Sequence, residues 1–116
     1  MRFIDADIPT QDYVYIIAND KDYIKVGISK DPNKRVKQLQ TGNPNKLKLL
    51  FTEEFECKRD HLLKIEKLIH KSLSPYKEDC LGEWFKIDMS KLQEIKNIII
   101  IHRIQYDANP LAFKFR

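Results

Sequence analysis

Two side chains capable of proton-transfer chemistry, Tyr15 and Lys25, lie in neighbouring segments that both favour β-strands. Segments 13–18 and 23–28 are rich in β-branched and aromatic residues, and the polar residues 19–22 between them are typical of a turn. Alternation along two paired strands would place Tyr15 and Lys25 on the same face of a hairpin. A phenol beside an ammonium can move protons. A plain amphipathic hairpin with two solvated polar side chains would produce the same pattern.

The opposite face of this hairpin is apolar and is expected to be buried. Its members are Val14, Ile16, Ala18, Ile24, Val26 and Ile28. Gly27 lies between two of these positions, and a glycine inside a strand often marks a close approach by another group. The sequence therefore predicts a rigid hairpin with one core face and one face available for chemistry.

Helical and strand patterns alternate after the hairpin. Asp31 suits a helix N-cap and Pro32 the first helical position, which predicts a helix through about residue 40. An apolar run predicts a third strand over 47–55, and apolar residues at positions 62, 65, 69 and 73 predict a helix over 59–73. We expect an irregular segment over 1–12, a loop over 76–82, a short strand over 83–87 and a last helix from about 91 to 106. The basic and aromatic tail over 109–116 could be a loose end, an oligomer contact or a strand that contacts nucleic acid, and the sequence leaves these open. The expected fold class is α/β (α+β), with a small three-stranded, mainly antiparallel sheet flanked by helices.

Three further polar side chains are expected near the face that carries Tyr15 and Lys25. Arg35 lies about one turn into the first helix, where its guanidinium could reach back over the hairpin. Glu66 lies at the edge of the apolar stripe of the second helix, and His70 lies one turn further along on the same side. A buried carboxylate needs a partner, either a metal ion or an Arg or Lys side chain, and the residues alone leave both options open.

The order and spacing of these residues resemble the signature of the GIY-YIG nuclease superfamily. Tyr13 stands where that pattern has its first glycine, and Lys25 stands where it has its second tyrosine, as in short phage and bacterial members that carry K-[IV]-G in place of YIG. The matching segments are Tyr13-Val14-Tyr15, Lys25-Val26-Gly27, Asp31-Pro32 with Arg35, Leu39, Thr41-Gly42-Asn43-Pro44, Glu66 with His70, and Gly82-Glu83-Trp84-Phe85.

The resemblance implies a metal-dependent endonuclease that hydrolyses phosphodiester bonds in DNA. In this interpretation Tyr15 accepts a proton from the attacking water, Lys25 favours the phenolate, and Arg35 holds the scissile phosphate. Glu66 would bind one Mg²⁺ or Mn²⁺ ion, and His70 would orient the water or contact the phosphate. A catalytically silent nucleic-acid-binding or protein-interaction module on the same fold is the main alternative. An unrelated α/β domain would require every match to be accidental.

Length and charge limit the possible functions. The 116 residues predict a single domain, with its core over about 13–87 and a C-terminal helix and tail over 88–116. This leaves no room for a separate recognition domain, so we expect little sequence specificity.

The net charge is +4, and the basic residues concentrate in 30–48. We expect that segment to bind DNA, or RNA, although a solvated lysine-rich surface is the alternative. The lysines concerned are Lys30, Lys34, Lys37, Lys46 and Lys48.

The remaining composition gives expectations about compartment. The two cysteines, Cys57 and Cys80, show no zinc-site spacing with each other or with histidines. We expect a reducing, cytoplasmic environment, with no signal peptide and no membrane span. The oligomeric state is left open.

Overall fold

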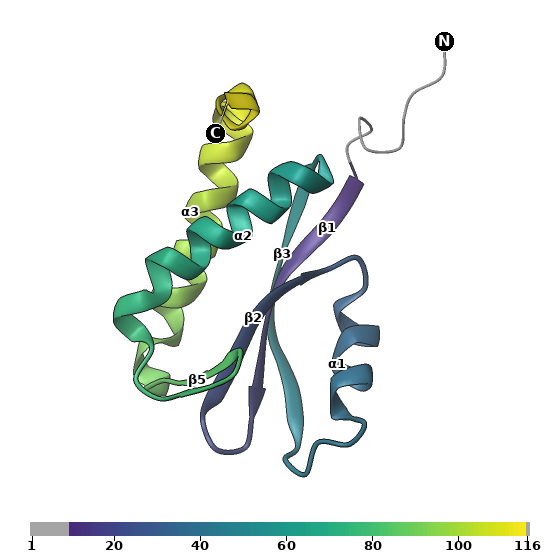
Figure 1. Cartoon of the computed structure of the whole chain (residues 1–116), viewed down its shortest axis with the longest axis vertical. Helices are drawn as coiled ribbons and strands as arrows, with labels where there is room; N and C mark the ends of the chain where they lie inside the picture. Colours follow the sequence, from purple (N-terminus) through teal and green to yellow (C-terminus); the bar gives the residue numbers. More distant parts are fainter. Residues whose placement is uncertain (1–9, 116) are drawn as a thin grey trace.

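The computed structural model describes residues 10–115 and forms an antiparallel sheet with helices on both faces (Figure 1). The helices agree with the predicted positions to within a few residues, and the first strand begins inside the segment expected to be irregular. The strands are β1 (Thr10–Asn19), β2 (Tyr23–Ser29), β3 (Leu47–Cys57), β4 (Cys80–Leu81) and β5 (Trp84–Lys86), and the helices are α1 (Pro32–Gln40), α2 (Arg59–Leu73) and α3 (Leu92–Ala108). Short 3₁₀ helices occupy Ser74–Tyr76, Met89–Lys91 and Pro110–Phe115.

The sheet confirms the predicted fold class but contains more strands than expected. It has five strands in the order β3-β1-β2-β5-β4, rather than three. Two strands are therefore additional: β5 corresponds to the short strand expected over 83–87, whereas β4 has only two residues and lies in the segment predicted as a loop. A strand this short carries no readable periodicity. It forms because β5 pairs with β2 and offers its other edge to Cys80 and Leu81.

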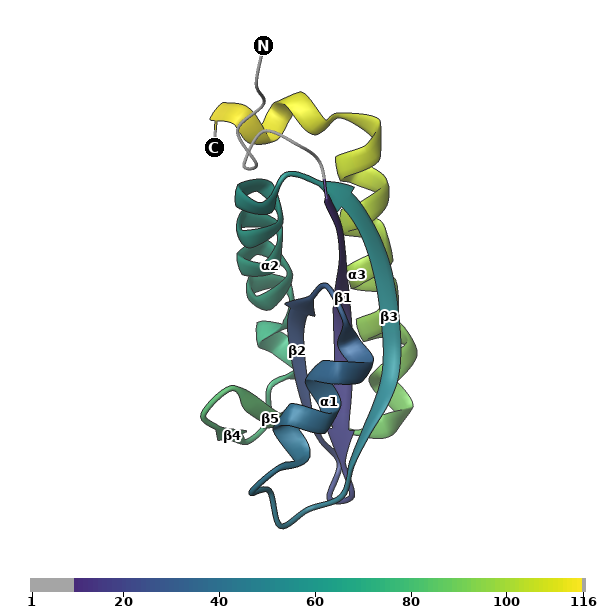
Figure 2. The ribbon, with the colours of Figure 1, turned by 90° about the vertical axis from the view of Figure 1, so that its right-hand side faces the viewer.

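The hairpin of β1 and β2 has the predicted register. Tyr15 lies opposite Gly27 and Ile17 lies opposite Lys25, so Tyr15 and Lys25 share one face. The opposite face belongs to the main core, which α2 and α3 cover (Figure 2). That core includes Val14, Ile16, Ala18, Ile24 and Val26, together with Phe55, Leu62, Ile65, Ile69, Ile95 and Ile99.

Helix α1 covers the face that carries Tyr15 and Lys25. Val36 and Leu39 from α1 pack against a second apolar cluster formed by Tyr15, Ile17 and Leu47. Tyr15 is 2% exposed and Lys25 is 7% exposed. The alternative of a solvated tyrosine and lysine is therefore wrong, because the hairpin is buried on both faces around these two residues.

The N-terminus of α1 shows the predicted cap, which determines where the helix begins. The Asp31 side chain accepts a hydrogen bond from the backbone N–H of Lys34 at 3.1 Å, and Pro32 occupies the first turn. Capping of this kind satisfies a backbone donor that has no partner within the helix. Arg35 consequently lies one turn into α1, next to the hairpin.

An ion pair joins the N-terminal end of β1 to the start of α2. The carboxylate of Asp12 is fully buried and accepts a hydrogen bond from the Arg59 guanidinium at 2.9 Å.

Both cysteines are free thiols, and burial raises the pKa of Cys57 to about 12. Among residues 10–115, no helix has the length and apolar character needed to cross a membrane.

Candidate active site

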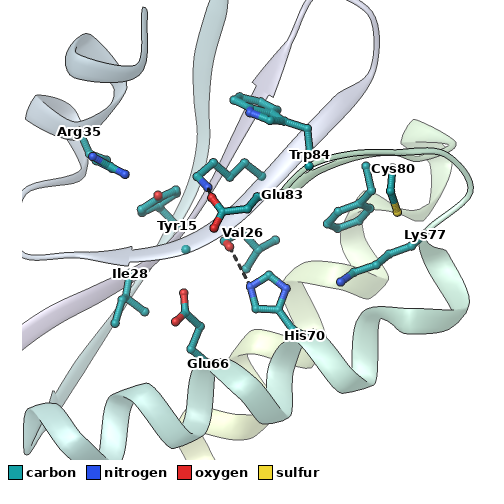
Figure 3. A pocket seen from close by; sticks show the side chains of 14 residues that line it. Tyr15, Val26, Ile28, Arg35, Glu66, His70, Lys77, Cys80, Glu83 and Trp84 are labelled. Atoms are coloured by element: carbon teal, nitrogen blue, oxygen red, sulfur yellow. Dashed lines mark hydrogen bonds and ion pairs between the residues drawn. The ribbon is translucent and has the colours of Figure 1, made fainter.

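A cavity of about 480 Å³ opens at the edge of the sheet beside β2 (Figure 3). Strand β5 pairs with β2 only at Tyr23 and Ile24, so the rest of β2 has no strand neighbour on that side. Side chains from both faces of the sheet meet at this gap. All the residues predicted as catalytic line the cavity, namely Tyr15, Lys25, Arg35, Glu66 and His70.

Tyr15 reaches the cavity because Gly27 lies opposite it in the hairpin. A Cβ atom added to Gly27 would lie 2.5 Å from the phenolic oxygen and 2.7 Å from Cζ of Tyr15. Those separations are far below van der Waals contact, so any other residue would displace the ring. The glycine predicted to permit a close approach therefore accommodates the phenol itself, not a separate backbone.

Lys25 forms an ion pair with Glu83, a residue to which the sequence assigned no role. The Lys25 ammonium donates to one carboxylate oxygen of Glu83. The Lys25 side chain is 9% exposed and that of Glu83 is 80% exposed, so a buried cation is paired with a largely solvated anion. The hydrogen bond from Lys25 and its charge, followed by the charges of His70 and Arg35, hold the pKa of Glu83 below its usual value.

Arg35 and Glu66 enter the cavity from opposite sides. In Figure 3, Arg35 points in from α1 while Glu66 rises from α2. Both are partly buried, and within residues 10–115 neither side chain forms a hydrogen bond or ion pair. The ion pair considered for Glu66 on sequence grounds does not occur in the part of the chain that the structure describes. Its carboxylate is thus available to a ligand.

His70 donates from Nε2 to the backbone carbonyl of Val26 at 3.0 Å. That carbonyl lies on the unpaired part of β2, which explains why it is free to accept. Because a carbonyl can only accept, Nε2 carries the proton and Nδ1 is the acceptor in the neutral ring. Burial, together with the charges of Lys77 and Lys25, lowers the pKa of His70 against the opposing effects of Glu66 and of the Val26 carbonyl.

Two further cavity residues, Glu83 and Lys77, were missed as site residues from the sequence. Glu83 belongs to a segment that the resemblance included without a role, and Lys77 lies in the predicted loop. Trp84, from the same segment as Glu83, lines the cavity as well. Lys25 and Glu83 are 58 positions apart, so no local spacing could have predicted their contact. Pairing of β5 with β2 brings them together. Trp84 also packs against the apolar cluster under α1, and Phe85 is core.

The predicted nucleic-acid-binding lysines are exposed but lie outside the cavity. Lys34 and Lys37 project from α1, the helix that delivers Arg35 to the cavity. Lys30 borders a separate hollow beside Tyr13, and Lys46 and Lys48 border another near Met89. The exposure of Lys34 and Lys37 is compatible with phosphate contacts along the surface of α1, as well as with simple solvation.

The cavity suits a divalent cation held by few protein ligands. Among residues 10–115 there is no group of three or more His, Cys, Asp or Glu side chains arranged to hold a metal ion. Mg²⁺ commonly uses one or two carboxylates and completes its shell with waters and phosphate oxygens. The unneutralised carboxylate of Glu66, facing open volume, fits that mode of binding.

The chain was compared with known proteins. A family model, the T5orf172 domain, matches residues 12–100, which include every residue that lines the cavity. This family is associated with endonucleases, and the match is compatible with a nuclease-like or DNA-binding module. No curated protein and no solved structure matches the chain.

Proposed function

Because the chain belongs to the T5orf172 domain family, we propose that it is a metal-dependent endonuclease of the GIY-YIG type that cleaves DNA with little sequence specificity. One observation carries this proposal. Tyr15 from β1, Arg35 from α1, and Glu66 and His70 from α2 converge on a single cavity. Hydrolysis of a phosphodiester needs a proton acceptor, cations around the phosphate and help for the leaving oxygen, and these side chains can supply them.

Arg35 is the residue proposed to bind the scissile phosphate. Its guanidinium is partly buried, points into the cavity and has no carboxylate partner within residues 10–115. A planar guanidinium can donate two parallel hydrogen bonds to phosphate oxygens, which orients the phosphate as well as neutralising it. Lys25 and Lys77 add positive charge to the lining of the cavity.

Tyr15 is the proposed proton acceptor. As the phenolate it takes a proton from water while the water oxygen bonds to phosphorus and the bond from phosphorus to the 3′ oxygen breaks. The departing 3′ oxygen ends as a hydroxyl by taking a proton from solvent. The ring is held by burial against Ile17 and by its position over Gly27, so the phenolic oxygen is fixed in place before substrate arrives.

Glu66 is the residue that would hold the metal ion. When bound, a divalent ion supplies charge stabilisation for the phosphate and for the leaving oxygen. His70 lies one turn from Glu66 on α2, and the N–H at Nε2 of His70 donates to the Val26 carbonyl. The acceptor nitrogen Nδ1 can therefore orient a water molecule at neutral pH, a positioning role that does not require His70 to change charge.

The proposal is tested by incubating the purified protein with labelled single-stranded, duplex and branched DNA, and with RNA. Each substrate is tested with Mg²⁺, with Mn²⁺ and with a chelator. We expect cleavage at many positions in the presence of a metal ion and none with the chelator. Binding without cleavage under every condition would contradict an enzyme and support the alternative module.

That alternative, a nucleic-acid-binding or protein-interaction module without catalysis, has one observation in its favour. Lys25 already has a carboxylate partner in the free protein, and it stands where the GIY-YIG pattern has a tyrosine. Binding alone requires only the cations of the cavity and of the surface around α1. Cleavage additionally requires Tyr15 and Glu66, so substitutions at these two positions distinguish the two functions.

A further inference from the structure

The β4–β5 hairpin places a carboxylate in a cavity that is also lined by three cationic side chains, those of Lys25, Arg35 and Lys77. Glu83 lies at the turn of this hairpin, directly after Gly82, whose φ of +62° produces the tight reversal. Its carboxylate reaches the Lys25 ammonium, and Figure 3 shows it between Tyr15 and His70. The carboxylate thus lines the candidate site and occupies the position next to the Lys25 ammonium.

Lys25 requires an anionic partner whether or not substrate is present. Its side chain is 9% exposed, and a desolvated ammonium without a partner would be strongly unfavourable. Within residues 10–115, Glu83 is the carboxylate that forms an ion pair with Lys25. A phosphate oxygen can accept the same charge-assisted hydrogen bond, so phosphate and carboxylate are interchangeable partners for this ammonium.

Exchange of Glu83 for a phosphate costs little, because its side chain is 80% exposed and water can solvate the released carboxylate while the phosphate pairs with Lys25. Glu83 lies in the turn between β4, which has only two residues, both exposed, and β5. Once it leaves, the permanent charges lining the cavity are those of Lys25, Arg35 and Lys77 against that of Glu66. The cavity then attracts phosphate more strongly, since one of its two carboxylates is removed.

From this arrangement we infer that Glu83 holds the place of a substrate phosphate oxygen on Lys25, and that a DNA phosphate displaces it on binding. The inference rests on the proposed function for its substrate class, although it concerns binding and not cleavage. Glu83 thereby keeps the buried ammonium paired in the free protein and competes with weakly bound anions. Ligands that present a phosphate to Lys25 and Arg35 together overcome this competition.

The test measures DNA binding without metal, so that no cleavage occurs. Trp84 is the only tryptophan in the chain and lines the cavity, so its fluorescence reports binding of a short single-stranded oligonucleotide in the presence of a chelator. The variant is Glu83→Gln, which keeps the shape and removes the charge. The matched control is Glu78→Gln, which removes one exposed charge from the same segment outside the cavity.

We expect Glu83→Gln to bind the oligonucleotide about fivefold more tightly than Glu78→Gln, because it removes one competing ion pair whose carboxylate is largely exposed. Combined with Lys25→Gln, the same substitution should bring no gain beyond the control. Equal affinities of Glu83→Gln and Glu78→Gln would overturn the inference, and so would weaker binding by Glu83→Gln.

The outcomes for the two proposals are separable. If the wild-type protein cleaves DNA with metal while Glu83→Gln and Glu78→Gln bind equally, the displacement of Glu83 is wrong and the nuclease stands. If Glu83→Gln binds more tightly through Lys25 but no cleavage occurs with any metal ion, the nuclease is wrong and the displacement stands. A wild-type protein that binds no oligonucleotide overturns both.

Discussion

The phenol of Tyr15 lies across Gly27 on the neighbouring strand, at a separation that leaves no room for a Cβ atom. The contact links a catalytic candidate directly to the glycine of the Lys25-Val26-Gly27 segment. It also explains why a glycine is needed at this position. Gly27 lies inside β2 and has no positive φ, so the requirement is for space and not for an unusual backbone conformation.

Gly27→Ala should destabilise the protein by about 1–3 kcal/mol, because the new methyl group overlaps a rigid, buried ring. In a Tyr15→Leu background the ring atoms nearest to Gly27 are absent, and the same substitution should cost little. Urea unfolding of the four proteins measures this coupling. If Gly27→Ala is tolerated equally in both backgrounds, Tyr15 is not what requires the glycine.

Tyr15→Phe should reduce DNA cleavage by about 10²- to 10⁴-fold, the range typical for the loss of a general base. The fold should be retained, because only one oxygen is removed from a ring that packs with Ile17 and Leu47. Single-turnover cleavage and thermal unfolding are measured on the same samples. Undiminished cleavage by a folded Tyr15→Phe would exclude the phenol as the base and make His70 the next candidate.

Glu66→Gln should abolish metal-dependent cleavage while leaving DNA binding in chelator largely intact. The substitution keeps the shape of the side chain but removes the charge that a hard cation prefers. Binding depends mainly on Arg35 and the surface lysines, so affinity should be unchanged or slightly higher. Cleavage by Glu66→Gln at the wild-type rate, across a Mg²⁺ titration, would remove Glu66 from the metal site.

Acidification should destabilise the wild-type protein more than His70→Gln. Burial and the charge of Lys77, followed by that of Lys25, lower the folded-state pKa of His70 below its ordinary value of 6.5, while Glu66 and the Val26 carbonyl oppose the shift. The unfolded chain therefore binds the proton more readily than the folded one. The contribution of His70 to stability is complete above pH 6.5 and declines as the pH falls below it. Urea unfolding in chelator from pH 8 to pH 5.5 should show the two curves diverging, whereas parallel curves would contradict this.

Replacement of Lys34 and Lys37 by glutamine should flatten the salt dependence of DNA binding. Each lost phosphate contact lowers the slope of log K against log salt by about 0.9 for duplex DNA or about 0.7 for single strands. Both side chains are exposed on α1, so the fold should be unaffected. Lys91→Gln, at the start of α3, is the control. Unchanged slopes in the double variant would assign these lysines to a solvated surface.

The sequence alone determined the longer helices and strands and the two faces of the hairpin. Alternation of β-branched residues predicted β1 and β2, the Asp31 cap predicted α1, and the spacing of Leu62, Ile65 and Ile69 predicted α2. These signals are readable because they repeat over a few residues, and local backbone geometry converts them directly into positions on a face. The same reasoning placed Tyr15 with Lys25.

Only the tertiary structure decided how the cavity forms at the edge of the sheet and which residue neutralises Lys25. The pairing of β5 with β2 stops after Ile24, which leaves the Val26 carbonyl free for His70 and brings Glu83 to Lys25. Strands β4 and β5 are too short to show a period, and the contact between Glu83 and Lys25 joins residues 58 positions apart. Such a contact depends on the register of distant strands, a property that no local pattern encodes.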